Sequence, residues 1–410
     1  MAHSPIQPDE RIAFLDVLRG FALLGILISN MPFFVRPFAT AMAGERVFGG
    51  PIDHVARQLV IFFVEGKFYP LFSLLFGIGL FVQMSRAEAS GARFGWLYAR
   101  RLAALGAIGA AHAFLVWPGD ILTNYAVLGF VLLVFRNSRP RTLAAAALAF
   151  AVVPFLVTVV SGLARSGPGA APGASAAAAA AHAWQVYGHG SFLEVTRERW
   201  HDYWLLLPSV RIMAPVMLCM FLTGLWLARR GVVHDVAGHR RLLVGIFAVC
   251  LPLGLLGNAL MVIARDRVAS DPAWRLVLLA TITFGGPLLS FAYASGIALL
   301  VAKDGWRRRL APLAAAGRMP LTNYLLQSLV CTTLFYGYGL GLQGSLGTAA
   351  AALLAIAIWA AQLGLSTLWL RRFACGPAEW LWRSLTYGQL PPMRLRPPPI
   401  AVAVDHHQRT

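Results

Sequence analysis

The stretch RIAFLDVLRGFALLGILISNMPFF, residues 11–34, is an apolar run long enough to cross a bilayer, yet it contains Asp16, Arg19 and Asn30. A charged side chain inside hydrocarbon costs a few kcal/mol or more, so such residues usually face a protein interior, a cavity or a partner. Asp16 and Arg19 are three positions apart and therefore share one face of a helix. The stretch predicts a membrane helix that lines an internal site.

The composition of the whole chain extends this prediction to the fold class. The chain has 410 residues, of which 58% are hydrophobic and only 13% are charged. Repeated apolar runs at this charge content predict an all-α, polytopic integral membrane protein. The formal net charge is +18, but the basic residues lie mostly in short loops between apolar runs. No basic stripe with interleaved aromatic residues occurs, so we expect the lipid bilayer as a partner and no nucleic acid.

We expect about ten transmembrane helices. They cover residues 12–34, 67–84, 98–117, 120–135, 142–163, 210–228, 242–264, 276–301, 310–340 and 346–370. When the loops between them alternate in side, 22 Lys and Arg residues fall on the side of the N-terminus and 9 on the other. The positive-inside rule then places both termini of this multi-pass protein in the cytoplasm.

The chain divides into five predicted regions. They are a cytoplasmic N-terminus (1–11), a helix group holding the site (12–163), an extracytoplasmic loop (164–209), a second helix group (210–388) and a disordered cytoplasmic tail (389–410). In the loop, residues 166–181 are rich in Gly, Ala, Pro and Ser and predict a flexible segment. Residues 192–207 predict a separate amphipathic surface helix, and AEWLWRSLTYG after Gly376 predicts another.

Topology places several polar residues at similar depth in the outer half of the first helix group. They are Asn30, Glu65, Lys67, His112 and Asp120. Because ionisable groups are costly in hydrocarbon, this convergence predicts one shared polar pocket between the early helices.

Each of these residues also has a structural interpretation. His112 can be an interhelical hydrogen-bond partner, Lys67 can extend to the interface, and Asp120 can cap the next helix. The remaining structural alternatives are an internal ion pair for Asp16 and Arg19, interhelical hydrogen bonds for Asn30, support of the ninth span by Arg318 and Asn323, and close helix packing at Gly77 and Gly79.

The cysteines and the glycine-rich run predict no metal site and no tightly bound cofactor. Cys219, Cys250, Cys331 and Cys375 lie in or beside apolar helices, with no CxxC and no His partner in sequence. The run GYGLG, residues 337–341, follows no strand, which argues against a dinucleotide site.

Four stretches resemble the YeiB-type bacterial membrane proteins, whose C-terminal half is a domain of unknown function. They are LDVLRGFALLGILISNM, FFVEGKFYPLFSLLFGIGL, RRLAALGAIGAAHAFLVWPGDILTNYAVLG and the C-terminal GRMPLTNYLLQSLV…FYGYGLGL…WLRRFACGPAEWLWRSLTYG. This resemblance covers nearly the whole chain. The opening Asp-x-x-Arg-Gly, here Asp16, Arg19 and Gly20, is also distantly similar to transmembrane acyltransferases of the heparan-glucosaminide N-acetyltransferase type and of the type that decorates surface sugars.

The second resemblance implies transfer of an acyl group from cytoplasmic acyl-CoA to an acceptor across the membrane. The sugar-decorating enzymes have a functional His where this chain has Asn30, and the heparan type has its catalytic His where this chain has Ala41. The nearest histidines here are His112 and, on the outer loop, His54. The resemblance therefore implies the reaction class and leaves the catalytic residue to be argued from this chain.

Together these resemblances imply a protein of the bacterial cytoplasmic (inner) membrane and a membrane-embedded acyltransferase with acyl-CoA as co-substrate and a hydroxyl or amine acceptor on a small molecule, lipid or glycan. Histidine is the side chain type whose unperturbed pKa suits a general base near neutral pH, which makes His112 the candidate. Asp120 or Glu65 can orient it, and Asn30 or Lys67 can stabilise an oxyanion. The other predicted contacts are Trp117, Asn124 and Tyr125 for substrate, and Arg19, Arg100 and Arg101 for CoA phosphates.

Two other classes remain open from the sequence. The same polar residues could line the path of a transporter or exporter of a small amphiphile, in which Pro215, Pro252, Pro287 and Pro320 would break helices. A structural subunit without chemistry is the third class. The sequence also leaves open whether the protein forms a homo-oligomer.

Overall fold

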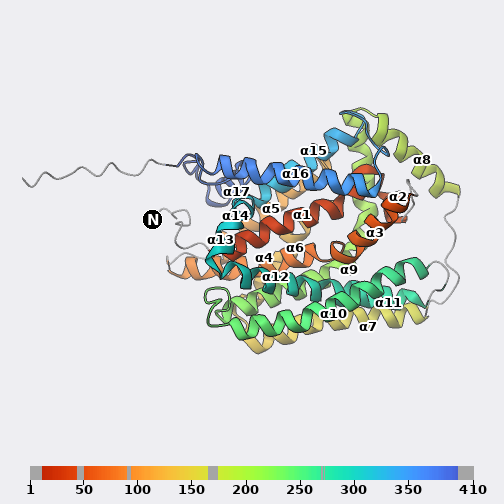
Figure 1. The fold of residues 1–410 in the computed structure, drawn as a ribbon. Helices are drawn as coiled ribbons and strands as arrows, with labels where there is room; N and C mark the ends of the chain where they lie inside the picture. The colour runs from red at the N-terminus through yellow and green to blue at the C-terminus, as the bar shows by residue number, and fades with distance from the viewer. Residues whose placement is uncertain are drawn as a thin grey trace, which may run out of the picture.

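The computed structural model describes residues 12–43, 50–89, 94–164, 174–268, 271 and 273–395. Helices dominate these residues, and their only β pairing is an isolated bridge between Phe373 and Arg394. In Figure 1 the long helices lie side by side along one direction, with α13, α14 and α17 at one end and α8 and α2 at the other. We refer to these as the α17 end and the α8 end. The predicted all-α membrane fold is confirmed.

The first half of the described chain forms α1 (Ala13–Val35), α2 (Phe38–Ala43), α3 (Pro51–Phe63), α4 (Phe68–Ala89), α5 (Phe94–Leu115), α6 (Leu122–Val134), the 3-10 turn η2 (Phe135–Asn137) and α7 (Pro140–Ala164). The second half forms α8 (Ala174–His189), α9 (Phe192–Arg229), α10 (Arg240–Arg267), α11 (Trp274–Ala280), the π-helix η3 (Thr281–Gly285), α12 (Gly286–Val301), α13 (Asp304–Arg309), α14 (Ala311–Gly317), α15 (Pro320–Phe335), α16 (Thr348–Trp369) and α17 (Pro377–Tyr387).

Seven helices in the described part of the chain are long and apolar enough to cross a membrane. They are Ala13–Val35, Pro51–Ala89, Pro140–Val160, Ile212–Arg229, Arg240–Arg267, Trp274–Val301 and Thr348–Trp369. Helices also occupy the other three predicted ranges, in α5, α6 and α14–α15, but these do not meet the same criteria of length and composition. A multi-pass membrane protein is supported, whereas the count of ten spans is not confirmed.

Helix α1 lies at the centre of the bundle and packs against α4, α12, α14, α15 and α16 (Figure 1). Gly20 permits the contact with α14, because a Cβ atom at this position would lie 2.0 Å from the carbonyl oxygen of Leu313. On the facing helix, a Cβ at Gly317 would lie 1.8 Å from the carbonyl oxygen of Asp16. The glycine of the Asp-x-x-Arg-Gly motif therefore serves a backbone-to-backbone contact.

Helices α4 and α9 meet in the same way. A Cβ atom at Gly77 would lie 1.9 Å from the carbonyl oxygen of Phe221, and one at Gly224 would lie 2.1 Å from that of Leu74. The predicted packing role of Gly77 fits this contact. Gly79 differs. A Cβ atom at this position would meet only Gln83 Nε2, at 4.0 Å, and the residue lines a cavity.

The predicted separation of a surface helix over 192–207 from a span at 210 is wrong. Helix α9 runs without a break from Phe192 to Arg229 and contains Pro208 and Pro215. Its first turn is fixed by a capping box, in which Ser191 and Glu194 satisfy each other's backbone N–H groups. The predicted flexible segment is wrong for residues 174–181, which begin α8, whereas residues 166–173 lie outside the described part.

The C-terminal segment forms the predicted amphipathic helix, α17. The residues after it are more ordered than predicted up to residue 395. Trp380 Nε1 donates a 2.7 Å hydrogen bond to the carbonyl of Pro391, and the backbone N–H of Ala374 donates to the carbonyl of Met393. Residues 396–410 of the predicted disordered tail lie outside the described part.

The α1–α14 contact predicts a strong effect of a single methyl group. Gly20→Ala should destabilise the protein by about 1–3 kcal/mol, because the added carbon meets backbone atoms that cannot turn aside. Gly364→Ala in α16 is the matched control, since a Cβ there meets nothing within 4 Å, and it should be neutral or stabilising by up to about 1 kcal/mol. Unfolding in detergent micelles measures both, and equal stabilities of the two variants would contradict the assignment.

Candidate functional site

The predicted polar residues do not share one pocket; they form two separate groups. His112 near the end of α5 contacts Asp120, which precedes α6. Glu65 and Lys67 lie between α3 and α4, where Glu65 pairs with Arg265 of α10. Similar depth in the membrane was therefore not sufficient to predict contact.

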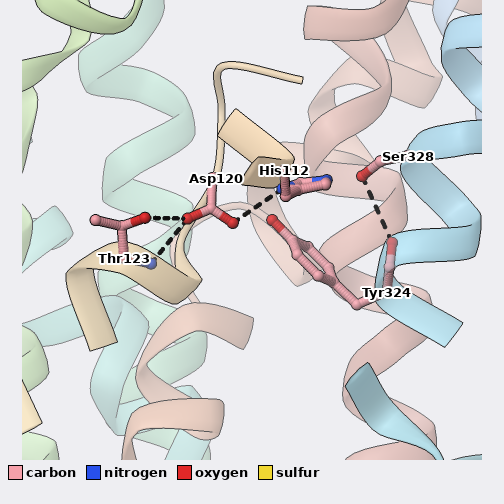
Figure 2. A network of polar contacts seen from close by, with 5 residues as sticks. All are labelled: His112, Asp120, Thr123, Tyr324 and Ser328. Carbon is pink, nitrogen blue, oxygen red and sulfur yellow. Dashed lines mark hydrogen bonds and ion pairs between the residues drawn. The ribbon is translucent and has the colours of Figure 1, made fainter. Parts of the chain in front are cut away.

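His112 and Asp120 form a buried pair (Figure 2). The distance from His112 Nδ1 to Asp120 Oδ1 is 2.9 Å, and the two side chains are 2% and 0% exposed. The second carboxylate oxygen, Oδ2, accepts hydrogen bonds from the backbone N–H and the hydroxyl of Thr123, at 2.8 and 2.9 Å. Asp120 therefore combines both predicted roles, since it caps the start of α6 and orients the imidazole.

The contact with Asp120 selects one tautomer of His112. In the tautomer in which Nδ1 donates to Asp120 Oδ1, Nε2 presents its lone pair. Among the described residues, buried His112 Nε2 has no hydrogen-bond partner. The pair thus has the arrangement of a general base whose orientation is set by a carboxylate.

Tyr324 of α15 lies against this pair. Its ring centroid is 5.2 Å from that of His112, and Figure 2 shows its phenol end directed toward His112 and Asp120. The hydroxyl is buried and has no hydrogen-bond partner in the described structure. Tyr324 was missed in the sequence because it lies more than 200 positions from His112, although the quoted stretch GRMPLTNYLLQSLV contains it.

Gly109 allows Asp120 to reach its position. A Cβ atom at Gly109 would lie 2.7 Å from both the backbone nitrogen and the hydroxyl oxygen of Thr123, and 2.9 Å from Asp120 Oδ2. The turn before α6 is therefore pressed against the bare backbone of α5, one turn before His112. No feature of the sequence distinguishes this glycine from the others in its helix.

A cavity of about 470 Å³ lies between the pair and the α17 end. Ile121, Tyr125 and Tyr324 line it beside the pair, and Trp382 and Tyr387 of α17 line it at the other end. His112 itself is not among the lining residues, so the ring of Tyr324 lies between the imidazole and the cavity. Much of the remaining wall is apolar and comes from α1, α4 and α5.

Five arginines line this cavity. They are Arg19, Arg86, Arg101, Arg318 and Arg383. Arg19 donates a 2.7 Å hydrogen bond to Asp16, which agrees with the predicted internal ion pair, and both residues also face the cavity. The guanidinium of Arg101 lies 3.5 Å from the ring centre of Trp382. Arg100 is not a lining residue and donates instead to the carbonyl of Leu385.

Glu379 is a buried carboxylate at the α17 end of the cavity. It accepts hydrogen bonds from the backbone N–H groups of Leu321 and Thr322, at 2.6 and 3.1 Å, and from the Thr322 hydroxyl at 2.5 Å. Burial raises the pKa of Glu379, while these hydrogen bonds act in the opposite direction. The carboxylate caps the N-terminus of α15 and thereby attaches α17 across the mouth of the cavity.

Lys67 and Glu65 make contacts that hold neighbouring helices together. Lys67 is 0% exposed, so its structural alternative, extension to the interface, is wrong. Its ammonium donates to the carbonyls of Ile61 and Glu65, at 2.5 and 2.6 Å, and its own carbonyl accepts from Ser290 of α12. These contacts fix the α3–α4 turn against α12, away from His112.

Of the other predicted contacts, Trp117 lies beside His112, with ring centroids 6.4 Å apart, and the rest have different surroundings. Tyr125 lines the cavity and donates to the carbonyl of Tyr69 at 3.0 Å. Trp117 is buried in a core cluster, stacked on Phe34 at 4.5 Å, and does not line the cavity. Asn323 bonds to Ala316 and Ser366, which agrees with its structural alternative. Asn30 and Asn124 are partly buried, and no hydrogen bond connects either to the pair in the described structure.

Comparisons with known proteins identify relatives along nearly the whole chain. A family model described as a protein of unknown function (DUF418) matches residues 227–389. The chain is 38% identical to the uncharacterized protein YxaH of Bacillus subtilis, over 94% of this chain and 97% of the relative. It is 30% identical to the uncharacterized protein YeiB of Escherichia coli, over 92% and 96%.

A third relative is an uncharacterized 39.9 kDa protein encoded in the amylase 3' region of Bacillus acidopullulyticus. It is 30% identical over 96% of this chain and 98% of its own length. No solved structure matches significantly. The resemblance to YeiB-type proteins is confirmed, whereas the distant similarity to acyltransferases stays a prediction.

The geometry of the pair predicts a tautomer switch in Asp120→Asn. Both Thr123 donors require an oxygen at the Oδ2 position, so the single amide oxygen should occupy it and the NH₂ group should face His112. Nδ1 must then accept, and the proton moves to Nε2. Nitrogen-15 NMR of histidine-labelled protein measures the tautomer, with His112→Ala identifying the signal. The same tautomer in wild type and Asp120→Asn would contradict the geometry.

Proposed function

The chain belongs to the YeiB family of bacterial membrane proteins, and we propose that it is a membrane-embedded acyltransferase that uses acyl-CoA. The donor enters the cavity from the α17 end, which the excess of Lys and Arg assigns to the cytoplasm of a bacterial inner-membrane protein. The acceptor carries a hydroxyl or amine and reacts near His112, toward the α8 end. The acceptor is a small molecule, a lipid or a glycan.

The observation that carries this proposal is the unpartnered Nε2 of a histidine held by a carboxylate inside an apolar bundle. A buried polar atom without a partner costs about 1–3 kcal/mol, so an orphaned imidazole nitrogen is unusual in a purely structural histidine. A substrate hydroxyl or amine would supply the missing partner.

The reaction needs only groups that the site contains. His112 Nε2 takes the proton from the acceptor as its oxygen or nitrogen attacks the thioester carbonyl. Asp120 stabilises the imidazolium. The tetrahedral intermediate then collapses, the C–S bond breaks, and the proton passes from His112 to the departing CoA sulfur, leaving an ester or amide and free CoA.

Tyr324 takes the place that the sequence assigned to Asn30 or Lys67. Its phenol end is directed toward the pair (Figure 2), the residue lines the cavity, and its hydroxyl has no partner among the described residues. A phenol donor positioned before the reaction can bond to the developing oxyanion in surroundings without competing water. This role requires the thioester carbonyl to reach the inner end of the cavity.

The cavity fits the two parts of an acyl-CoA donor. Its volume of about 470 Å³ is within the usual range for small-molecule sites. Arginines near α17, including Arg318 and Arg383, would bind the phosphates, and the apolar wall toward Tyr125 would hold the acyl and pantetheine portions.

His112→Ala should lower thiol release from acyl-CoA by about 10²–10⁴-fold, because the acceptor loses its base. The control is His54→Ala, which removes the other candidate histidine, an exposed residue of α3. The assay follows free CoA from acetyl-, butyryl- and palmitoyl-CoA with purified protein in detergent.

Full activity of His112→Ala would refute the catalytic assignment. If wild type releases no thiol from any of these donors but moves a labelled amphiphile across proteoliposomes without a covalent product, the transporter is correct instead. Activity that His54→Ala abolishes and His112→Ala retains would move the site to α3, the helix that contains His54.

Gly79→Leu should weaken CoA binding at least about tenfold, because the new side chain occupies the cavity where the donor would lie. Gly364→Leu is the matched control on an exposed helical position with nothing within 4 Å of its Cβ. Isothermal titration with CoA compares the two. Equal affinities would show that the donor does not use this cavity.

A further inference from the structure

The contact between α8 and α9 brings together two carboxylates and two imidazoles. Glu198, His201 and Asp202 follow the i, i+3, i+4 spacing that places side chains on one face of a helix. Their candidate ligand atoms all lie within 4.8 Å of one another. His182 of α8 adds a fourth ligand, since its Nε2 lies 3.8 Å from Glu198 Oε2.

This set of donor atoms matches a particular class of ion. Imidazole nitrogens combined with carboxylate oxygens are typical ligands of Zn²⁺, whereas Ca²⁺ and Mg²⁺ prefer oxygen ligands alone. Two carboxylates and two neutral imidazoles would also balance the charge of a divalent cation. A Glu-x-x-His pair on one helix, completed by ligands from a neighbouring helix, is an established way to build such a site in helical proteins.

The spacing of the atoms permits tetrahedral coordination after small side-chain movements. Ligand atoms about 2.0–2.1 Å from a tetrahedral Zn²⁺ are about 3.3 Å apart. The observed separations are 3.8 Å between His182 and Glu198 and 4.0 Å between His201 Nδ1 and Asp202 Oδ1. Both imidazoles are exposed, at 66% and 67%, so their side chains can rotate toward the carboxylates and shorten these separations.

Asp202 is already held in place for this role. Its side chain is 5% exposed, and Oδ2 accepts a 2.7 Å hydrogen bond from the buried hydroxyl of Tyr187 on α8. Oδ1 remains on the side of His201. Such a second contact to a ligating carboxylate is a common feature of metal sites, because it fixes the orientation of the ligand.

The nearby cation does not occupy this position. Arg199 is fully buried and donates to the carbonyl of Leu115 and to the hydroxyl of Tyr338, both at 2.7 Å. Its guanidinium also lies over the rings of Tyr336 and Tyr338. These partners engage Arg199 with α5 and with the segment after α15, so the carboxylates of Glu198 and Asp202 remain available.

We propose that His182, Glu198, His201 and Asp202 bind a divalent transition-metal ion of the zinc type that joins α8 to α9. This ion is structural. It would fasten α8 to the half of α9 whose Arg199 bonds to Leu115, three residues after His112. The proposal does not depend on the reaction at His112, because it concerns different residues and a different ligand.

The test uses the purified full chain, freed of any affinity tag and treated with a chelator, in detergent. Zn²⁺ should bind with a stoichiometry of one and raise the midpoint of thermal unfolding. Co²⁺ should give the visible absorption of a four-coordinate site, and Mg²⁺ should produce neither effect. His201→Ala and Glu198→Gln should each weaken Zn²⁺ binding at least tenfold, whereas His189→Ala, an exposed histidine at the end of α8, should not.

Tyr187→Phe removes only the hydrogen bond to Asp202 and should weaken binding by about 10–100-fold while the ligands remain. The comparison is valid for variants that retain the wild-type elution volume and helical circular dichroism. Equal Zn²⁺ affinity in wild type, His201→Ala and Glu198→Gln would show adventitious binding only and overturn the proposal. A wild-type protein that binds Zn²⁺ but shows no acyl transfer would refute the proposed function and leave this site intact.

Discussion

A polar atom inside an apolar bundle must find its partner within the protein, and this constraint arranges most of the interior. The ammonium of Lys67 bonds to two backbone carbonyls, Asn323 bonds to α14 and α16, and Glu379 bonds to the start of α15. Each of these three side chains therefore has hydrogen-bond partners within the protein. His112 differs from these three, because Asp120 holds one nitrogen and leaves the other without a partner among the described residues. Several other buried polar atoms, such as Asn258 Oδ1 and the Tyr336 hydroxyl, also have no partner there, but a neutral imidazole nitrogen is the one that can act as a base near neutral pH.

Backbone contacts at glycines give the bundle its shape and leave space for the cavity. Gly20 and Gly77 bring α1 against α14 and α4 against α9. Gly79 lies two positions after Gly77, on nearly the opposite face of α4, and borders the cavity. Neighbouring glycines in one helix thus have different consequences: one permits contact and the other preserves an open volume. Gly109 has a third consequence, because the absence of a side chain leaves room for the turn that places Asp120 beside His112.

The long α9 connects the two regions for which we propose functions. Its first half lies over the end of α5 through Arg199, and its second half packs on α4 beside the cavity. A rigid helix transmits displacement along its length better than a surface helix joined by a loop. An ion at His201 and Asp202 would therefore limit movement of the structure above His112, without contacting the acyl-transfer site.

The sequence by itself determined the all-α membrane fold, because apolar length and charge distribution are properties of the chain alone. It also predicted that Asp120 or Glu65 would orient His112, and the structure places Asp120 there. Only the tertiary structure decided which residues at equal depth would meet: depth fixes one coordinate, while helix packing fixes the position around the bundle. For that reason Glu65 was found with Arg265, and Tyr324, distant in sequence, was found beside the imidazole.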